Sequence, residues 1–386
     1  MAELFGQRWS RAELERRIGH VSQLGGLRLL SSDNGPSRGV RLIEFRTGTG
    51  FMFEVALDRG MDVGRAEYRG ASLAWMPPTL MPGPWYFEQQ TEFGWLRTAL
   101  GGFNNTCGLI HIGNPETAEV GHYNFPARPR ERYGVHDRAA MIPAELVSLV
   151  ERWEGDDLVM EAVGRVTQAQ AYGENLVMTR TYRAELGRAA FVMEDVIENR
   201  AFVPVEHMLL YHYNIGFPLV DAGAELIAPS AARPKLLFGT ADLDDPRSWS
   251  SFIAPQANFT QQTFAHEMAA DAEGRVHVAI VNARLGLGVA VSYDKRVMPN
   301  YIEWRMMAEG QYAVGIEPCT NGFGREAVKA AGELIMLKPG ERRVYRTEIS
   351  VLDGAAAIEH FRGKVAAVLR DGSVVGAWGR GGVPVS

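Results

Sequence analysis

Short stretches in which apolar and polar residues alternate cover most of the chain between residues 38 and 353. This alternation places apolar side chains on one face of an extended segment, which is typical of half-buried β-strands. The stretches recur about every 10 to 15 residues and are separated by turn residues, a spacing typical of all-β proteins. Clear examples are 40–45, 51–55, 158–166, 177–184, 190–198, 277–281 and 289–293. The pattern predicts an all-β body.

Helical patterns occur at the two ends of the chain. Ser10 and Glu13 form a capping-box sequence, which predicts a short helix that ends near Ile18. Between Ala355 and Leu369 the apolar residues recur at helical spacing, which predicts a helix with one apolar face. The residues of that face are Ile358, Phe361, Val365 and Val368.

Neither a fixed-period repeat nor a low-complexity linker divides the chain. We therefore expect one domain: an N-terminal helix and lead-in (1–37), a β body (38–353), and a C-terminal helix and tail (354–386). A body of roughly 310 residues is too long for one ordinary small sandwich, so we expect a very large sandwich of two broad antiparallel sheets. The glycine-rich tail from Gly372 to Ser386 is expected to be loose.

One long strand is predicted over Glu206 to Val220, where aromatic and branched residues occupy both faces. One face carries Met208, Leu210, His212 and Asn214, and the other carries Leu209, Tyr211, Tyr213 and Ile215. A strand this apolar belongs near the middle of a sheet, where an imidazole must hydrogen-bond or line a cavity. For a lone histidine, a core position with a backbone carbonyl as partner is the commoner outcome.

A second stretch, from Glu309 to Asn321, gives His212 a candidate chemical partner. Alternation places Tyr312, Val314 and Ile316 on one face of this strand and Ala313, Gly315 and Glu317 on the other. A carboxylate beside alanine and glycine has open space above it, as at the floor of a ligand site. We therefore predict that His212 and Glu317 lie on the concave side of one large sheet.

Composition excludes several functional classes. The chain has 386 residues, 46% of them hydrophobic, and its 40 basic and 46 acidic residues leave a net charge of −6. The charges are evenly spread, so no basic surface favours nucleic acid or an anionic membrane. The apolar runs are too short to span a membrane, and residues 1–20 lack the apolar segment of a secretory signal.

The two cysteines, Cys107 and Cys319, are expected to be reduced thiols in a cytoplasmic protein. The nine histidines include no HExxH sequence and no closely spaced ligand pair, so we expect no metal site. No dinucleotide or phosphate-binding fingerprint occurs, because Leu285–Gly288 leads into a predicted strand. No serine lies in a nucleophile elbow. We expect no cofactor.

Two loop stretches carry further polar residues. The first, 93–109, contains Arg97, Asn104, Asn105 and Cys107, and the second, 133–143, contains His136, Asp137 and Arg138. Considered alone, each is more simply a surface loop.

Several phrases resemble the galactose mutarotase (aldose 1-epimerase) superfamily, and specifically its bacterial DUF4432 branch. These phrases begin at Ser22 (SQLGG), Asp58 (DRGMDVGRAEYRG), Gly101 (GGFNNTCGL), Tyr211 (YHYNIGFPL) and Trp304 (WRMMAEGQYAVGIEPCTN). The resemblance extends from about Leu24 to Phe361. It implies a β-supersandwich with a sugar in a cleft on its concave face.

The resemblance also implies roles for individual residues. It makes His212 in HYN the general acid, Glu317 in GIEP the general base, and His136 a ligand of sugar hydroxyls. Asp137 stands where the family pattern has glycine, Arg97 is the nearest candidate for a family arginine, and His266 occupies the region of a mid-chain aspartate. The full set of expected substrate-binding residues is His136, Arg97, Arg138, Asn105, Asn214, His266, Arg305 and Trp304.

These residue types suit the interconversion of sugar anomers, which needs a base for the anomeric hydroxyl and an acid for the ring oxygen. Unperturbed pKa values are about 4.3 for glutamate and about 6.5 for histidine, so near neutral pH the carboxylate is ionised and the imidazole can be protonated. The expected partner is a monosaccharide or a modified sugar, without nucleic acid or membrane, and a homodimer is left open.

Two alternatives stay open at this point. The same histidine and glutamate could serve an isomerase or lyase acting on an acidic, oxidised or sulfonated sugar. Arginines close to the pair (Arg97, Arg138 or Arg305) would favour that substrate, because guanidinium groups bind anions through two hydrogen bonds. The other alternative is a non-catalytic carbohydrate-binding protein, which would have no use for an acid–base pair.

Overall fold

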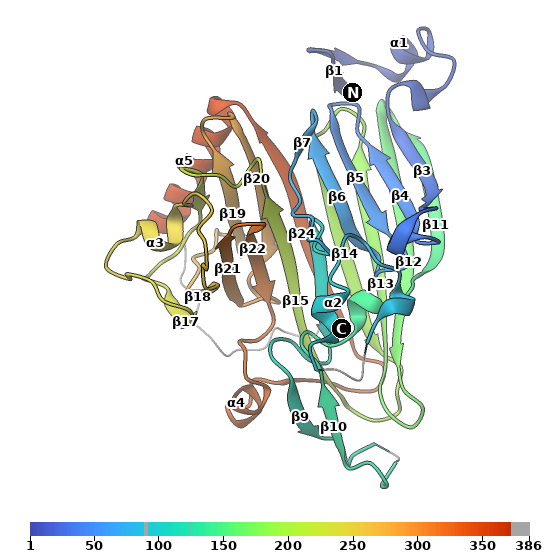
Figure 1. Cartoon of the computed structure of the whole chain (residues 1–386). Helices are drawn as coiled ribbons and strands as arrows, with labels where there is room; N and C mark the ends of the chain where they lie inside the picture. The colour runs from blue at the N-terminus through green and yellow to red at the C-terminus, as the bar shows by residue number, and fades with distance from the viewer. Residues whose placement is uncertain (89–91, 124, 372–386) are drawn as a thin grey trace.

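The computed structural model describes residues 1–88, 92–123 and 125–371. The predicted glycine-rich tail lies outside these residues. Two layers of β-sheet face each other, and their long strands are visible side by side in Figure 1. The strand pairings within the sheets of the described part are all antiparallel. The prediction of an all-β fold built from broad antiparallel sheets is confirmed.

The first layer is an eight-stranded sheet. In spatial order its strands are β11 (Glu145–Glu154), β12 (Asp157–Ala169), β13 (Asn175–Glu185), β14 (Ala190–Asn199), β24 (Arg342–Asp353), β20 (Leu287–Asp294), β19 (Arg275–Asn282) and β16 (Glu225–Ile227). The burial of β14 alternates residue by residue, and that of β13 does so from Met178 onward, as the sequence predicts.

The second layer contains a seven-stranded and a five-stranded sheet. The seven-stranded sheet runs β17 (Lys235–Phe238), β18 (Gln262–His266), β21 (Asn300–Ala308), β22 (Gln311–Cys319), β15 (Val205–Gly216) and β23 (Ile335–Leu337), with β8 (Asn104–Leu109) also paired to β15. The five-stranded sheet runs β3 (Gly26–Ser31), β4 (Arg41–Arg46), β5 (Phe51–Ala56), β6 (Asp62–Tyr68) and β7 (Ala71–Ser72). A bridge between Ala74 and Ile215 links the two sheets.

The main core lies between the layers. Phe53 of the second layer stacks on Phe191 of the first with ring centroids 4.3 Å apart. Tyr211 and Tyr213 of β15 are fully buried in the same core. Because strand residues alternate between faces, His212 and Asn214 point to the opposite side of the second layer. The long strand predicted at 206–220 is therefore present as β15, in the interior of its sheet.

The short helices lie around the sheets (Figure 1). They are α1 (Arg11–Glu15), α2 (Gly94–Arg97), α3 (Arg247–Ser250), α4 (Arg325–Ala330) and α5 (Ala355–Asp371), with 3₁₀ turns at Val21–Gln23, Gly35–Ser37, Pro84–Tyr86 and Ala139–Met141. Helix α5 packs its predicted apolar residues, including Phe361 and Val365, against the outer face of the eight-stranded sheet. The capping box of Ser10 and Glu13 is present, but α1 ends at Glu15, before the expected Ile18.

Two hairpin-like pairs complete the fold: β1 (Ala2–Leu4) with β2 (Gln7–Trp9), and β9 (Glu116–Glu119) with β10 (Arg130–Tyr133). Strands β1, β2 and β3 were not expected in the N-terminal lead-in. Strands β1 and β2 span only three residues each, so they are too short to show a periodic pattern. None of the helices in the described part of the chain combines the length and apolar character needed to cross a membrane.

Candidate functional site

His212 and Glu317 meet on the face of the second layer that points away from the core. The imidazole Nε2 of His212 lies 2.9 Å from Oε1 of Glu317, and the side chain of Glu317 is only 2% exposed. Neither Oε1 of Glu317 nor Nδ1 of His212 has an aligned hydrogen-bond partner among the described residues. Buried polar atoms normally have such partners, so this pair is equipped to bind a ligand.

Gly315 leaves the space in which the pair meets. It lies on β22 opposite Asn214 of β15 and Trp304 of β21. A Cβ atom at Gly315 would approach Oε1 of Glu317 to 2.5 Å and Cε1 of His212 to 2.9 Å, closer than real Cβ contacts. The small residue that suggested open space in the sequence therefore makes room for the two functional side chains.

The pair lies in a pocket of about 460 Å³. Its polar lining includes Asn105, Asn214, His136, Gln261, Thr263 and Gln311. Its aromatic lining comes from Trp75, Trp95, Trp304, Phe93, Phe238 and Phe323. Aromatic faces combined with a few polar groups suit a ring that is apolar on its faces and polar at its edge.

Trp304 forms one wall beside the imidazole. Its ring lies 5.5 Å from that of His212 and 5.9 Å from that of Trp75, both measured between centroids. The indole Nε1 donates a hydrogen bond to Oε1 of Gln261 at 3.0 Å, which holds the ring in place. Trp304, one of the expected substrate-binding residues, therefore lies in the pocket beside His212.

His136 reaches the same space from a loop. Its ring centroid lies 6.2 Å from that of His212 and 5.1 Å from that of Trp95. The backbone N–H of Gly113 donates to Nδ1 of His136 at 3.3 Å, which places the proton of a neutral ring on Nε2. Burial, assisted by the nearby His212, lowers the pKa of His136 to about 3. At neutral pH the ring is therefore uncharged and can donate one hydrogen bond from Nε2.

The backbone at His136 and Asp137 adopts a conformation that favours glycine. Both residues have positive φ angles, 56° and 57°. Glycine adopts this conformation freely, and aspartate is among the few other residues that tolerate it. Oδ2 of Asp137 also accepts a hydrogen bond from Gln168 at 2.7 Å, and burial raises the pKa of Asp137 to about 6.

Asn105 and Asn214 complete the floor. Asn105 pairs in register with His212, and its Nδ2 donates to the carbonyl of Gly101. The Oδ1 atom of Asn105 is buried and has no partner among the described residues, so it can accept a hydrogen bond from a ligand. Asn214 donates to the same carbonyl at 3.2 Å.

Four expected substrate-binding residues are absent from the described lining of this pocket. Arg97 is 67% exposed and pairs with Glu88 at 3.2 Å, and Arg138 pairs with Glu174 at 2.8 Å. Arg305 donates to the carbonyls of Ser248 and Ser251.

His266 is the fourth of these residues. It is buried against Glu303 and Ser230. Strand alternation explains why Arg305 and His266 are absent from the pocket lining. Trp304 and Thr263 occupy the pocket face of the same strands, so Arg305 and His266 point to the opposite face.

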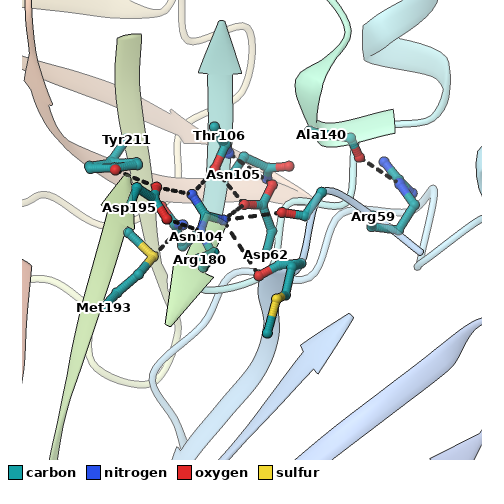
Figure 2. Close-up of polar contacts among 12 residues, drawn as sticks. Arg59, Asp62, Asn104, Asn105, Thr106, Ala140, Arg180, Met193, Asp195 and Tyr211 are labelled. Carbon is teal, nitrogen blue, oxygen red and sulfur yellow. Dashed lines mark hydrogen bonds and ion pairs between the residues drawn. The ribbon is translucent and has the colours of Figure 1, made fainter. Parts of the chain in front are cut away.

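A buried ionic network supports the strands under the site (Figure 2). Arg180 of the first layer donates to Asp195 at 2.6 and 2.7 Å and to Asp62 at 2.6 Å, and all three side chains are fully buried. Arg180 also donates to the hydroxyl of Thr106, and Tyr211 donates to Asp195. Thr106 follows Asn105 and Tyr211 precedes His212, so the network holds both site strands from behind.

A second buried arginine ties the loops around the pocket together. Arg59 donates to the carbonyls of Pro82, Thr98 and Ala140, which belong to three separate segments. Burial lowers the pKa of Arg59 to about 10, so it stays charged at neutral pH. Figure 2 shows Arg59 bonded to Ala140.

Sequence reasoning missed Trp75 and Trp95 as lining residues. In the 93–109 stretch we selected Arg97, whereas α2 directs its neighbours Trp95 and Leu96 into the pocket lining. The buried Nε1 of Trp95 has no partner among the described residues. A tryptophan shortly before the paired glycines Gly101 and Gly102 was the signal available in the sequence. In the described residues no group of three or more His, Cys, Asp or Glu side chains is placed to hold a metal ion.

Solved structures with the same fold include relatives of sugar epimerases. A proposed aldose 1-epimerase from Klebsiella pneumoniae matches with a TM-score of 0.81 and 21% identity, covering 98% of each chain. A galactose mutarotase-like protein from Clostridium acetobutylicum matches with a TM-score of 0.53 and 13% identity, covering 85% of this chain and 99% of its own. Galactose 1-epimerase from Lactobacillus acidophilus matches with a TM-score of 0.51 and 11% identity, covering 86% of this chain and 99% of its own.

A comparison with curated proteins returns no match. The family model for the domain of unknown function DUF4432 matches residues 37–351, which is most of the chain. The predicted family resemblance is thereby confirmed, and the structural matches establish the galactose mutarotase-like fold. The chain belongs to the DUF4432 family.

Proposed function

We propose that this protein interconverts the anomers of a sugar, as an aldose 1-epimerase does, with His212 and Glu317 as its acid–base pair. The observation that carries the proposal is the 2.9 Å contact between Nε2 and Oε1 at the floor of an aromatic pocket. The fold shared with a galactose 1-epimerase supports it.

The geometry of the pair fits the geometry of the reaction. The ring oxygen and the anomeric hydroxyl of a cyclic sugar are bonded to the same carbon, so the two proton-transfer targets are close neighbours. Each catalytic group must come within about 2.6 to 3.2 Å of its target. Two groups already in contact can reach two such neighbouring oxygens.

Ring opening begins with the Glu317 carboxylate and the His212 imidazolium. Glu317 removes the proton of the anomeric hydroxyl while His212 protonates the ring oxygen, and the bond between C1 and the ring oxygen breaks. The open-chain aldehyde then rotates about C1–C2. For closure, His212 takes the proton from the attacking hydroxyl and Glu317 returns its proton to the carbonyl oxygen. The pair regains its starting state, so no other reactant is consumed.

The remaining polar groups bind and orient the sugar. His136 can donate from Nε2, Asn105 can accept at Oδ1, and Trp95 can donate from Nε1. The Trp304 ring offers an apolar face beside the reacting carbon.

The lining favours a sugar without a charged substituent near its reducing end. The ionisable residues that line the described pocket are His136, His212 and Glu317, with no arginine or lysine among them. An acidic or sulfonated sugar would leave its anion without a lysine or arginine partner in this space, which is unfavourable. The arginines that would have favoured an acidic substrate pair with Glu88, Glu174 and backbone carbonyls instead.

The test is to follow anomerically pure neutral and acidic aldoses by NMR with the wild-type protein and with E317Q. We expect wild-type protein to accelerate equilibration of at least one neutral aldose, and E317Q to bind that sugar while losing the acceleration. Binding without acceleration by wild-type protein would assign it to the non-catalytic sugar binders. Acceleration confined to acidic sugars would contradict the argument from the lining.

A further inference from the structure

A second compartment adjoins the catalytic pocket. This outer compartment is lined by Asn114, Glu116, Lys235, Leu237, Phe238 and Phe323, and measures about 590 Å³. Asn114, Phe238 and Phe323 also line the pocket that holds His212 and Glu317. The three shared residues place the two spaces side by side, so the outer compartment is within reach of a ligand that extends past them from the acid–base pair.

Two phenylalanines form the boundary between the spaces. The rings of Phe238 and Phe323 lie 6.3 Å apart between centroids, tilted by 41°. Phe238, at the end of the edge strand β17, is 39% exposed. Phe323 lies against Gly113, where an added Cβ would approach its ring to 2.8 Å. One ring is thus held against the protein wall while the other faces solvent at the mouth.

Polar groups line the outer compartment around these rings. Lys235 is exposed, and Asn114 carries its side chain at the surface. Oε1 of Glu116 accepts a hydrogen bond from the backbone N–H of Arg325 at 3.0 Å, which fixes the carboxylate at the rim. Aromatic faces flanked by an amide, an ammonium and a carboxylate match the apolar faces and hydroxyl edge of a sugar ring.

We propose that this outer compartment is a subsite for a second sugar ring, so that the substrates include reducing disaccharides. The inference rests on the proposed function, because it places the reducing-end ring over His212 and Glu317 and the next ring against Phe238 and Phe323. The two volumes, about 460 and about 590 Å³, each lie within the range of about 300 to 1,000 Å³ that is usual for ligand pockets, so each space has room for one ring.

The experiment compares each monosaccharide with disaccharides that have it at their reducing end, for example glucose with maltose, cellobiose and lactose. Mutarotation is measured for the wild-type protein, F238A, F323A and F238Y. Because both phenylalanines also line the pocket of the acid–base pair, the readout is selectivity: we expect F238A and F323A to lower kcat/KM about tenfold more for the preferred disaccharide than for its monosaccharide. F238Y retains the ring and should behave like the wild-type protein.

Phe202 supplies the matched control, because it is 97% exposed and is not among the residues lining either compartment. F202A should leave kcat/KM unchanged for both the disaccharide and its monosaccharide. If F238A and F323A lower kcat/KM equally for monosaccharides and disaccharides, or lower it for neither, the subsite is overturned while the epimerase activity stands.

Calorimetric binding of the same sugars to E317Q separates the two proposals. If wild-type protein equilibrates no sugar, but F238A in the E317Q background weakens disaccharide binding selectively, the subsite holds and the proposed activity fails. If no disaccharide binds more tightly than its monosaccharide, the subsite is overturned.

Discussion

Nε2 of His212 lies 2.9 Å from Oε1 of Glu317, although the two residues belong to different strands, β15 and β22. Proton transfer to two neighbouring oxygens requires the two groups to lie within about 8 Å of each other, and this contact satisfies that requirement. The pair is therefore the natural target of mutagenesis.

Removing either member of the pair should abolish turnover and preserve the fold. We expect E317Q and H212N to lower the rate of mutarotation by two or more orders of magnitude, because each loses a positioned proton donor or acceptor. NMR on an anomerically pure sugar measures the rate, and circular dichroism checks the fold. A folded variant that retains the wild-type rate on the true substrate would refute the mechanism.

Gly315 should be as sensitive as the pair itself. The methyl group of G315A would displace Glu317 and His212, and a misplacement of about 1 Å can cost about 10²-fold in rate. We expect a comparable fall in turnover by NMR. G363A is the control: Gly363 lies in α5, with no heavy atom within 4 Å of an added Cβ, so activity should be unchanged. Normal activity of G315A would show that the pair tolerates displacement.

The Arg180 network should dominate the stability of the site strands. In R180M, Asp62 and Asp195 lose their cation in a fully buried place, which typically costs about 3 to 5 kcal/mol. Denaturant unfolding measures the loss. R233M removes the exposed pair of Arg233 with Asp244 and should cost about 1 kcal/mol or less. Equal losses of unfolding free energy in R180M and R233M would show that the Arg180 network does not dominate the stability of the site strands.

His207 should make part of the stability depend on pH. Burial lowers its pKa from 6.5 to about 4, and its ring is bonded to Tyr345 and to the carbonyl of Leu109. Between these pH values the unfolded chain binds the proton and the folded chain does not, so this contribution to stability falls as pH falls from about 6.5 to about 4.

In H207Q that contribution disappears. The dependence of the unfolding free energy on pH should therefore be flatter than in the wild-type protein by up to about 1.4 kcal/mol per pH unit. Parallel pH profiles for the two proteins, measured by denaturant titration between pH 7 and pH 4, would show that His207 is not the group responsible.

The two cysteines should be inert in the folded protein. Both are free, as predicted; both are also fully buried, and burial raises the pKa of each thiol well above its usual value. Because the thiolate is the reactive form, a chromogenic disulfide reagent should label neither residue at neutral pH and both after denaturation. C107S should retain most of its activity. Rapid labelling of native protein would contradict this burial.

Much of the fold was readable from local pattern. Strand alternation and helical spacing depend on neighbouring residues alone, so β15, β22 and the apolar face of α5 were predicted at nearly their true bounds. The same alternation could have shown that Trp304 and Arg305 face opposite sides of β21, because adjacent strand residues always do.

The sequence by itself determined that His212 and Glu317 each occupy a strand face beside residues that leave room for a ligand. Only the tertiary structure decided that the two faces meet, and that Arg97 and Arg138 are paired elsewhere with Glu88 and Glu174. Which charged groups come together depends on how distant strands and loops pack. No local period encodes that packing, so the aromatic walls of the pocket emerged only when the strands and loops were assembled.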